Sequence, residues 1–506
     1  MAETAAEPVA HRWEWRVFGT RLESAERVFS ALTPVGEAAD TEETYILGPG
    51  DVNVKIRFAL LDIKKLIVVD ENGLELWAPI SKSEFPMPAD EVGEVFRAWD
   101  LPPPEFEREV FELSEFLDEI VVPRSDLEVV TVRKHRIRYS IEGCMSELTS
   151  LTANGREIKT IAAETEDPNA VLAAVEKLGM SGHLNTNYNR GLRCLLGMTP
   201  VRYAVVDIGT NSVKFHIGEQ HPDGAWTRVV DRAEVSRLGE GLDDTGEIQP
   251  EPLERTIRAV DGMLAEAREN RVLAIAVVGT AALRIASNSS VVTESVRQRV
   301  GVPVEVVSGE EESRLAYLAV SAGIGVSDGE VVVFDTGGGS TQFTFGKSGE
   351  VDERYSVNVG AVAYTERFGL DQAVDDDTIE EARSALRDGL ASLDGRSTPD
   401  ALVGMGGATT NLTAVSLSLD PYDPDVVQGA TITSKEVARQ IALYSSMDQE
   451  ARRSIVGLQA NRAPVILAGA LVVATVMEKL GQESVIVSDR GLRHGLIRER
   501  FGMFSA

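Results

Sequence analysis

Two short stretches decide the fold of this chain, Asp207-Ile-Gly-Thr-Asn-Ser212 and Asp335-Thr-Gly-Gly-Gly-Ser340, and both have the pattern Asp-x-Gly-x-x-Ser. Each follows an apolar run, at 203–206 and 331–334, and each precedes a stretch of alternating apolar residues. This order predicts a strand, a glycine-rich turn and a second strand. Because the unit occurs twice, the sequence predicts a duplicated α/β architecture with a cleft between the halves.

Each predicted turn brings a carboxylate and a row of backbone N–H groups to the end of a strand. Asp207 and Asp335 are placed to orient a hydrated divalent ion. The three adjacent glycines 337–339 let a ligand approach the backbone amides closely. A single turn of this kind is explained as well by a glycine that needs a positive φ. Two turns facing one another predict a clamp for a metal-bound phosphate chain.

Three further features are candidates for this site, and each has a structural alternative. Gly404-Met-Gly-Gly-Ala-Thr-Thr410 either contacts phosphate or begins a helix capped by Thr409 or Thr410. Glu310-Glu-Glu312 opens a predicted helix, where acids complement the helix dipole or hold an attacking water. Arg284 could bind phosphate oxygens or form a surface salt bridge.

Composition narrows the class of protein. The 506 residues are too many for one core, so two to four domains are expected. The formal net charge of −30 argues against nucleic acid or an anionic membrane as a partner. Cys144 and Cys194 provide no disulfide framework, which favours the cytoplasm. The longest apolar stretch, Pro464–Met477, is too short to span a bilayer and predicts a core helix.

The region before residue 200 has a different pattern from the rest. We expect a disordered N-terminus at 1–10, a first domain over 11–198, and two α/β lobes at 201–325 and 326–506, the second with C-terminal helices. Alternation with period 2 predicts an antiparallel sheet or barrel in the first domain. The alternating segments are 13–18, 52–60, 66–70, 129–141 and 158–164.

Charged residues recur at alternate positions of these segments. Lys134, Arg136 and Arg138 share one face of a strand, as do Lys55 and Arg57. They could simply face solvent. If the strands close into a barrel with these faces inward, they form a cationic tunnel for a polyanion. Four acids could face the same lumen, pairing with the cations or holding metal: Glu14, Glu147, Glu164 and Glu166.

The part from 203 to about 500 resembles the exopolyphosphatase/guanosine-pentaphosphatase (Ppx/GppA) family of the actin-like ATPase superfamily. The resemblance implies two ribonuclease-H-like lobes with the site between them. It implies removal of terminal phosphate from inorganic polyphosphate or guanosine pentaphosphate with Mg²⁺ (or Mn²⁺). The matching stretches are the two Asp-x-Gly-x-x-Ser units, Arg237–Gly241, Gly279–Arg284, Val307–Arg314 and Ser488–Arg493.

The same resemblance assigns roles to individual residues. Asp207 and Asp335 resemble the metal-orienting carboxylates, Glu312 the base that activates water, and Arg284 a phosphate clamp. At the position of Gln342 the family pattern has an acidic residue, and an amide is a poorer base and metal ligand. The remaining expected substrate-binding residues are Asn211, Ser212, Gly337, Gly338, Gly339, Ser340 and Thr341.

Residues 11–195 resemble the CYTH/triphosphate-tunnel domain, an eight-stranded barrel whose first strand carries the pattern Glu-x-Glu-x-Lys. Here that strand has Arg12, Glu14 and Arg16, so one acid is missing. The resemblance implies polyanion binding by the inward cations, and the missing acid puts hydrolysis in the barrel in doubt.

Three functions are therefore open. The first is a magnesium-dependent phosphohydrolase whose barrel holds the polyanion. The second is a catalytically weakened protein that binds polyphosphate or an alarmone, favoured by Gln342 and Arg12. The third is a barrel with its own triphosphatase activity. A homodimer is possible in each case.

Overall fold

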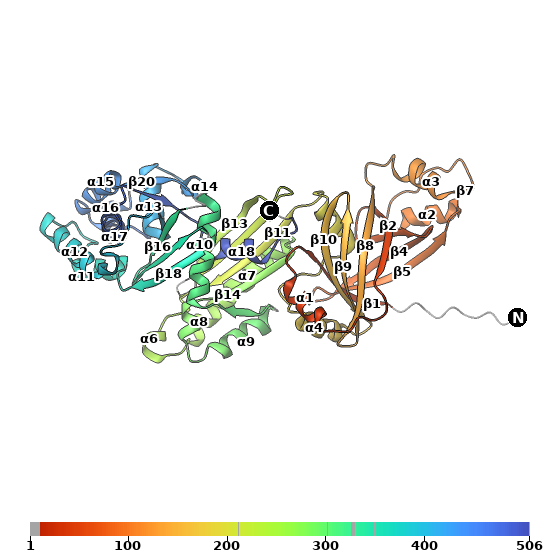
Figure 1. Cartoon of the computed structure of the whole chain (residues 1–506), viewed down its shortest axis with the longest axis horizontal. Helices are drawn as coiled ribbons and strands as arrows, with labels where there is room; N and C mark the ends of the chain where they lie inside the picture. Colours follow the sequence, from red (N-terminus) through yellow and green to blue (C-terminus); the bar gives the residue numbers. More distant parts are fainter. Residues whose placement is uncertain (1–10, 211, 301, 325–328, 349, 505–506) are drawn as a thin grey trace. The chain divides into compact units, whose positions relative to one another are not determined.

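The computed structural model describes residues 11–210, 212–300, 302–324, 329–348 and 350–504 (Figure 1). The disorder predicted for 1–10 therefore lies outside the described residues. The chain divides into two compact units, one comprising Met1–Val306 with Arg500–Ala506 and the other comprising Val307–Glu499. Among the described residues, none of the helices combines the length and the apolar character needed to cross a membrane.

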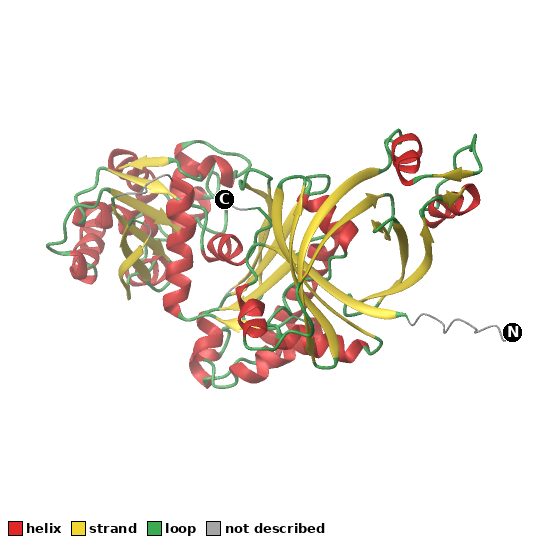
Figure 2. Cartoon of the chain, turned by 45° about the vertical axis from the view of Figure 1, so that its right-hand side comes forward, coloured by secondary structure: helices red, strands yellow, loops and turns green. Residues whose placement is uncertain are grey.

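The first unit begins with a closed antiparallel barrel of eight strands, in the order β1-β10-β9-β8-β2-β3-β4-β5 (Figure 2). The barrel expected from the alternating segments is thus confirmed. Its strands are β1 (Arg12–Gly19), β2 (Ala39–Leu47), β3 (Val52–Arg57), β4 (Leu60–Val69), β5 (Glu75–Glu84), β8 (Glu128–Ile141), β9 (Cys144–Ala153) and β10 (Arg156–Thr165).

Apolar side chains of the barrel point mainly outward, against helices. One cluster packs Tyr139 of β8 against Phe29 of α1 and Val171 of α4. A second cluster packs β3 and β4 against Phe96 of α2. Because the helices bury the outer face, the inward face is left for polar residues. The helical and short elements around the barrel are α1 (Glu23–Ser30), β6 (Met87–Pro88), α2 (Ala89–Ala98), β7 (Val110–Phe111), α3 (Leu113–Glu115), η1 (Phe116–Val121), α4 (Pro168–Lys177) and α5 (Tyr188–Leu195).

The same unit contains lobe I, a five-stranded sheet in the order β13-β12-β11-β14-β15. The central strand β11 is antiparallel to β12 and parallel to β14. Helix α7 buries Val260 and Met263 in the core of this lobe. The elements are β11 (Val201–Ile208), β12 (Ser212–Gln220), β13 (Trp226–Val235), α6 (Leu242–Thr245), α7 (Pro250–Glu269), β14 (Ala274–Gly279), α8 (Ala281–Ile285), α9 (Ser289–Val300) and β15 (Val304–Val306).

The barrel and lobe I share backbone hydrogen bonds. The N–H of Ile275 donates to Gly182 O at 2.7 Å, and the N–H of Leu184 donates to Leu273 O at 2.9 Å. Residues 182–184 thereby pair with the first residues of β14, which β15 does not cover. A Cβ at Gly182 would lie 2.7 Å from Ile275 O, so this close approach requires glycine. Backbone hydrogen bonds therefore join the barrel to lobe I.

The second unit contains lobe II, a six-stranded sheet in the order β18-β17-β16-β19-β21-β20. Strand β16 is antiparallel to β17 and parallel to β19, as β11 is to β12 and β14, which confirms the predicted duplication. The predicted lobe boundary at 325/326 stays a prediction, because residues 325–328 lie outside the described ones. The strands are β16 (Glu330–Thr336), β17 (Thr341–Lys347), β18 (Glu350–Val357), β19 (Ala401–Met405), β20 (Thr431–Thr433) and β21 (Ser484–Val487).

Helix α17 occupies the core of lobe II and includes most of the apolar stretch predicted as a core helix. Leu471, Val472 and Val473 are all fully buried in it. The helices of this unit are α10 (Gly309–Ile324), α11 (Ala361–Phe368), α12 (Asp376–Gly389), η2 (Ala391–Leu393), α13 (Gly406–Ser416), α14 (Pro424–Val427), α15 (Ser434–Ser445), α16 (Gln449–Arg452), α17 (Ile466–Lys479) and α18 (Leu492–Arg500), whose last residue belongs to the first unit.

Candidate functional site

The two Asp-x-Gly-x-x-Ser turns have the same hydrogen bond. The N–H of Gly209 donates to Ser212 O at 3.1 Å, and the N–H of Gly337 donates to Ser340 O at 2.9 Å. Both turns connect two antiparallel strands and follow an aspartate at the end of the first strand. The repeated sequence pattern therefore corresponds to a repeated structure, with one half-site in each lobe.

In lobe I the aspartate of the turn is buried. Asp207 is 4% exposed, and its Oδ1 has no hydrogen-bond partner among the described residues. Its Oδ2 lies 3.6 Å from Nζ of Lys214, the residue opposite it on β12. Arg284 is exposed on α8, directly after the neighbouring parallel strand β14. Ser212 begins β12, and Asn211 lies outside the described residues.

The stretch Arg237–Gly241 supports this turn. The N–H of Gly239 donates to Thr210 O at 2.9 Å. A Cβ at Gly239 would lie 2.3 Å from Cγ2 of Thr210, so a larger residue would push the turn away. Arg237 itself is exposed. The packing of Gly239 against the turn thus explains why this stretch resembles the family pattern.

In lobe II the aspartate lies against the start of a helix. Gly406 has φ +79°, and a Cβ at this position would lie 2.2 Å from Oδ1 of Asp335. Only glycine fits both the backbone conformation and the nearby carboxylate. Gly406 is the first residue of α13, so Asp335 lies beside the positive end of that helix.

The start of α13 has no side-chain cap, contrary to one of our predictions. Thr409 and Thr410 lie inside the helix, where their hydroxyls donate to the carbonyls of Met405 and Gly406, at 3.2 and 3.1 Å. The Ncap residue is Met405, and its side chain accepts no hydrogen bond. The predicted helix is correct, but the predicted capping is wrong because both threonines bond backward along the helix.

The glycine-rich turn of lobe II offers fewer amides than the sequence suggested. The amide of Gly337 is used by the turn itself. In the part of the chain that is described, the amides of Gly338, Gly339 and Ser340 have no backbone partner. The carbonyls of Gly337 and Gly338 instead accept hydrogen bonds from residues 361–363 at the start of α11. Three amides therefore remain as candidate phosphate donors.

The next two residues, Thr341 and Gln342, have different surroundings. Thr341 is fully buried, and its hydroxyl donates to Val359 O at 2.7 Å, which is a structural role. Gln342 is exposed and faces Asp335 across β16 and β17. Its Nε2 donates to Ser340 Oγ at 2.8 Å. The amide side chain of Gln342 thus lies at the turn. An acidic residue at position 342 would place a carboxylate there, facing Asp335.

The three consecutive glutamates at the start of α10 have different environments. Glu310 forms an ion pair with Arg354 at 2.9 Å, and Glu311 forms one with Arg314 at 2.7 Å. The third, Glu312, is half-buried. Because the first two are engaged by arginines, they are poor candidates for a general base. Glu312 remains the base that the family resemblance implies.

One candidate phosphate ligand was missed by the sequence reasoning. The guanidinium of Arg462 covers the first turn of α13, since a Cβ at Gly407 would lie 2.4 Å from Arg462 Cζ. The residue precedes α17 and is exposed. It lies more than a hundred residues from the turn in sequence, so no local pattern links the two.

The residues present fit a hard divalent ion. Mg²⁺ and Mn²⁺ prefer oxygen ligands, and carboxylates at strand ends provide them. The unpartnered, buried Oδ1 of Asp207 is the kind of oxygen that a hydrated ion would satisfy. In the other lobe, Asp335 has the same chemical type of ligand.

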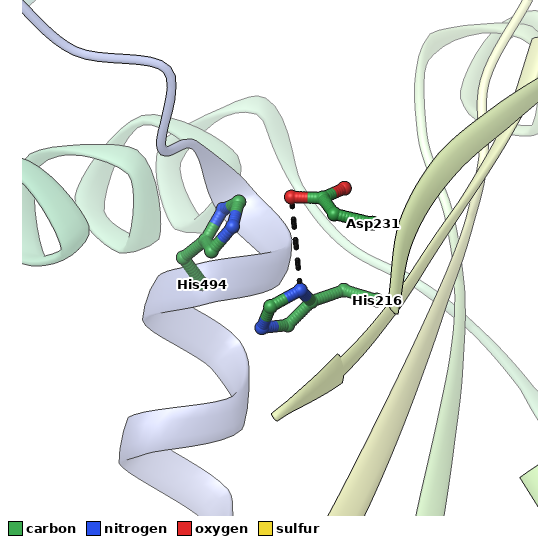
Figure 3. A group of neighbouring side chains, drawn as sticks. All are labelled: His216, Asp231 and His494. Carbon is green, nitrogen blue, oxygen red and sulfur yellow. Dashed lines mark ion pairs between the residues drawn. The ribbon is translucent and has the colours of Figure 1, made fainter. Parts of the chain in front are cut away.

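Lobe I also contains a polar pair away from its turn. His216 on β12 and Asp231 on β13 are register partners, and Nδ1 of the histidine lies 3.7 Å from Oδ2 of the aspartate (Figure 3). Both side chains are largely buried. At 3.7 Å, Nδ1 and Oδ2 are too far apart for a direct hydrogen bond.

The barrel lumen contains the predicted cations, but they face acids of the barrel itself. Arg16 donates to Glu14 at 2.8 Å and to Glu147 at 3.0 Å. Lys134 donates to Glu43 at 2.7 Å and to the hydroxyl of Tyr45 at 2.6 Å. These buried pairs neutralise much of the lumen. The lumen therefore has a mixed lining in which acids pair with the cations, one of the arrangements considered from the sequence.

Burial and pairing shift the pKa values of these groups. Burial alone would raise the pKa of Glu43, but the nearby Lys134 lowers this pKa to about 2. Burial lowers the pKa of Lys134 to about 8, despite the opposing effect of Glu43. Burial and the charge of Glu14 raise the pKa of Glu75 to about 7. One acid of the lumen thus titrates near neutral pH.

The remaining predicted tunnel residues divide into two groups. Lys55 and Arg136 line the lumen, as do Glu14, Glu147 and Glu164. Arg57 is part-exposed and lies 3.8 Å from Glu43. Arg138 is exposed, and Glu166 is exposed beyond the end of β10, so neither belongs to the lining. Sequence reasoning missed the inward acids Glu43, Asp62 and Glu75, which occupy alternate positions of their strands.

Comparison with known proteins places the α/β part of the chain among two-lobed phosphatases with an actin-like fold. Residues 201–503 match the Ppx/GppA phosphatase family, and the chain belongs to this family. The match spans more than half of the chain and includes both half-sites.

The similarity extends to curated relatives and solved structures. Exopolyphosphatase 1 of Mycobacterium tuberculosis is 31% identical over 302 residues, which is 59% of this chain and 87% of that protein. The bifunctional 3-dehydroquinate synthase/phosphatase of Fusobacterium nucleatum is 26% identical over 58% of this chain, and the match spans only 46% of that protein. The Aquifex aeolicus Ppx/GppA phosphatase is 33% identical, with a TM-score of 0.55 over 59% of this chain and 99% of that structure.

Proposed function

We propose that this chain hydrolyses the terminal phosphate of inorganic polyphosphate, or the corresponding phosphate of guanosine pentaphosphate, in a magnesium-dependent reaction. The pair of matching half-sites, each with an aspartate beside a glycine turn, is the observation that carries the proposal. Relatives named exopolyphosphatase and guanosine-5'-triphosphate,3'-diphosphate pyrophosphatase support the reaction class.

In this proposal Asp207 and Asp335 hold the ion. When bound, the ion neutralises phosphate charge and polarises the phosphorus–oxygen bonds. The amides of 338–340 and the guanidinium of Arg462 bind oxygens of the terminal phosphate, as the first turn of α13 does. Glu312 takes the proton of the attacking water, and Arg284 binds the phosphate chain.

We rank polyphosphate above the nucleotide as substrate. The barrel contains inward cations, and the proposal includes a second site for phosphate there. A second site on the same chain would raise the effective concentration of a long polyanion at the lobes. A nucleotide with two short phosphate groups gains less from such a site. This ranking predicts a lower KM for long chains than for short ones.

Glu312→Ala compared with Glu310→Ala tests the proposed base. The two residues belong to the same first turn of α10, but Glu310 is exposed and paired with Arg354. Release of orthophosphate from long-chain polyphosphate with Mg²⁺ should fall about 10²–10⁴-fold in Glu312→Ala. It should stay near the wild-type rate in Glu310→Ala. Equal rates in both variants would show that Glu312 is not the base.

A second candidate function is binding without efficient turnover. It is favoured by Gln342, which occupies the position facing Asp335, and by Arg12, which is paired with Glu164 at the barrel. A wild-type protein that binds polyphosphate but releases none, together with release by Gln342→Glu, would establish this alternative.

A further inference from the structure

Arg16 lies inside the barrel with its guanidinium between two carboxylates. Its Nε donates to Oε1 of Glu14 at 2.8 Å, and its Nη1 donates to Oε1 of Glu147 at 3.0 Å. The ring of Tyr188 covers the guanidinium, with Cζ of the arginine 4.3 Å from the ring centroid. The side chain of Arg16 is only 8% exposed. Two carboxylates and a ring face therefore hold one buried positive charge at this point of the lumen.

The strand register explains why this guanidinium reaches both acids. Arg16 on β1 is opposite Ala162 on β10, which is in turn opposite Glu147 on β9. Because Ala162 has only a methyl group, the arginine side chain can extend across β10 to the glutamate. The backbone of Arg16 is also fixed, since its N–H donates to Oδ1 of Asn185 at 2.8 Å and its carbonyl accepts from the N–H of Thr186 at 2.7 Å. The position of the guanidinium is thus built into the fold.

The sequence left two roles open for the acids of the lumen, pairing with cations or holding metal. A divalent ion such as Mg²⁺ requires several oxygen ligands in a near-octahedral arrangement at about 2.1 Å. Between Glu14 and Glu147 it would lie against a guanidinium that does not lose its proton in proteins. Among the described residues, no three carboxylates of the lumen bring ligand oxygens within 4.8 Å of one another. The lumen therefore does not fit a divalent ion.

The other inward acids are engaged as well. Glu75 accepts hydrogen bonds from Asn187 and Trp77. The rest have basic partners at distances between 2.7 and 3.6 Å: Glu43 with Lys134, Asp62 with Lys55, and Glu164 with Arg12. Each of these acids thus has a partner within the protein.

Titration does not separate Arg16 from its acids near neutral pH. Burial alone would raise the pKa of Glu147, but Arg16 and Arg136 lower it below its ordinary value. Burial alone would lower the pKa of Arg16, but Tyr188 and the two neighbouring acids raise it. Both members of the pair therefore stay ionised, and the guanidinium keeps its place between the carboxylates.

We propose that the guanidinium of Arg16 takes the place of a divalent ion in the barrel, so that the lumen holds no metal and has no triphosphatase activity of its own. This inference removes the third function that the sequence left open. It concerns residues of the barrel alone and does not rest on the function proposed for the lobes. Any release of phosphate by the chain then comes from the lobes.

Binding of Mn²⁺ to the full chain tests the proposal, with the free ion measured by electron paramagnetic resonance. The parent protein carries Asp207→Asn and Asp335→Asn, which remove the carboxylates proposed to hold an ion in the lobes. Three variants are made in this parent: Glu14→Gln, Arg16→Ala and the matched control Arg12→Ala. Arg12 lies on the same strand and pairs with an acid of the lumen, but its removal leaves Arg16 in place.

We expect the parent, Glu14→Gln and Arg12→Ala to bind Mn²⁺ equally. Arg16→Ala should bind about one additional ion, because it leaves two buried carboxylates without their shared cation. This additional ion should be lost when Glu147→Gln is added. Thermal unfolding shows which variants are folded, and the comparison of the parent with Glu14→Gln decides the matter if Arg16→Ala is not.

Three results would overturn the proposal. The first is an ion that the parent binds and Glu14→Gln loses, since the lumen would then hold metal despite Arg16. The second is a folded Arg16→Ala that binds no additional ion. The third is release of orthophosphate from tripolyphosphate by the parent with Mg²⁺ that Glu14→Gln abolishes. Phosphate release by the chain with both aspartates intact tests the proposed hydrolysis separately.

Discussion

Asp207 faces Lys214 across β11 and β12, with Oδ2 and Nζ 3.6 Å apart, and Asp335 faces Gln342 at the same position of the second hairpin. The duplicated turns therefore have different partners for their aspartates. In lobe I the partner is a cation that can contact phosphate, whereas in lobe II it is a neutral amide. This difference is where we expect the activity of the chain to be set.

Gln342→Glu should raise the rate of phosphate release. A carboxylate at this position adds a charged oxygen opposite Asp335, which strengthens a metal site or provides a second base. We expect a gain of roughly 10- to 100-fold in kcat, measured with long-chain polyphosphate and Mg²⁺. Gln342→Ala serves as the control for loss of the hydrogen bond to Ser340. An equal or lower rate in Gln342→Glu would show that the amide is not limiting.

Much of the site was predictable, because both halves are local patterns. The strands, the turns, the position of Asp207 and Asp335 at strand ends and the helix after Ser308 all follow from consecutive residues. Arg462 was not predictable as a site residue, because its closeness to Gly407 depends on the packing of distant elements. Gly406 lies in the candidate stretch 404–410, but its close approach to Asp335 was not predictable for the same reason. In the barrel, inward acids such as Glu43 and Glu75 were missed since the strands that contain them alternate less clearly.

Gly406→Ala should reduce activity more than its effect on stability explains. The left-handed conformation costs an alanine about 1–2 kcal/mol, and the new Cβ would also displace the carboxylate of Asp335. Gly395→Ala is a matched control, because Gly395 has φ +75° and its Cβ would meet nothing within 4 Å. We expect similar losses of unfolding free energy in both variants but loss of phosphate release only in Gly406→Ala. Similar rates in the two variants would contradict the proposed role of Asp335.

Removal of residues 1–198 should destabilise lobe I. The truncation removes the hydrogen bonds from residues 182 and 184 to the edge of β14, and it uncovers Phe501, whose ring contacts His183. At about 1 kcal/mol for each of these two hydrogen bonds, we expect the Tm of lobe I to fall by roughly 8–16 °C. Scanning calorimetry of the truncated and full chains measures the change. Gly182→Ala in the full chain should shift Tm in the same direction, and unchanged values in both would contradict the shared edge.

Glu75 should make stability depend on pH near neutrality. Its pKa in the fold is raised to about 7, so its neutral form adds to the free energy of unfolding. This contribution is complete below the ordinary pKa near 4.5 and is lost as the pH rises to about 7. Glu75→Gln should therefore gain stability relative to wild type by about 3 kcal/mol between pH 4.5 and pH 8. Lost hydrogen bonds from Trp77 and Asn187 give an offset that does not vary with pH. Urea unfolding at both pH values measures the difference, and a constant difference would refute this assignment.

We propose that phosphate release requires both Asp207 and Asp335. The most direct measurement is the initial rate of orthophosphate release from long-chain polyphosphate with Mg²⁺, in wild type, Asp207→Asn, Asp335→Asn and the double variant. Our account predicts release by the wild type, a loss of at least about a hundredfold in each single variant, and little further loss in the double variant, because residues that act as a unit are not additive. Release at the wild-type rate in either single variant would contradict the account.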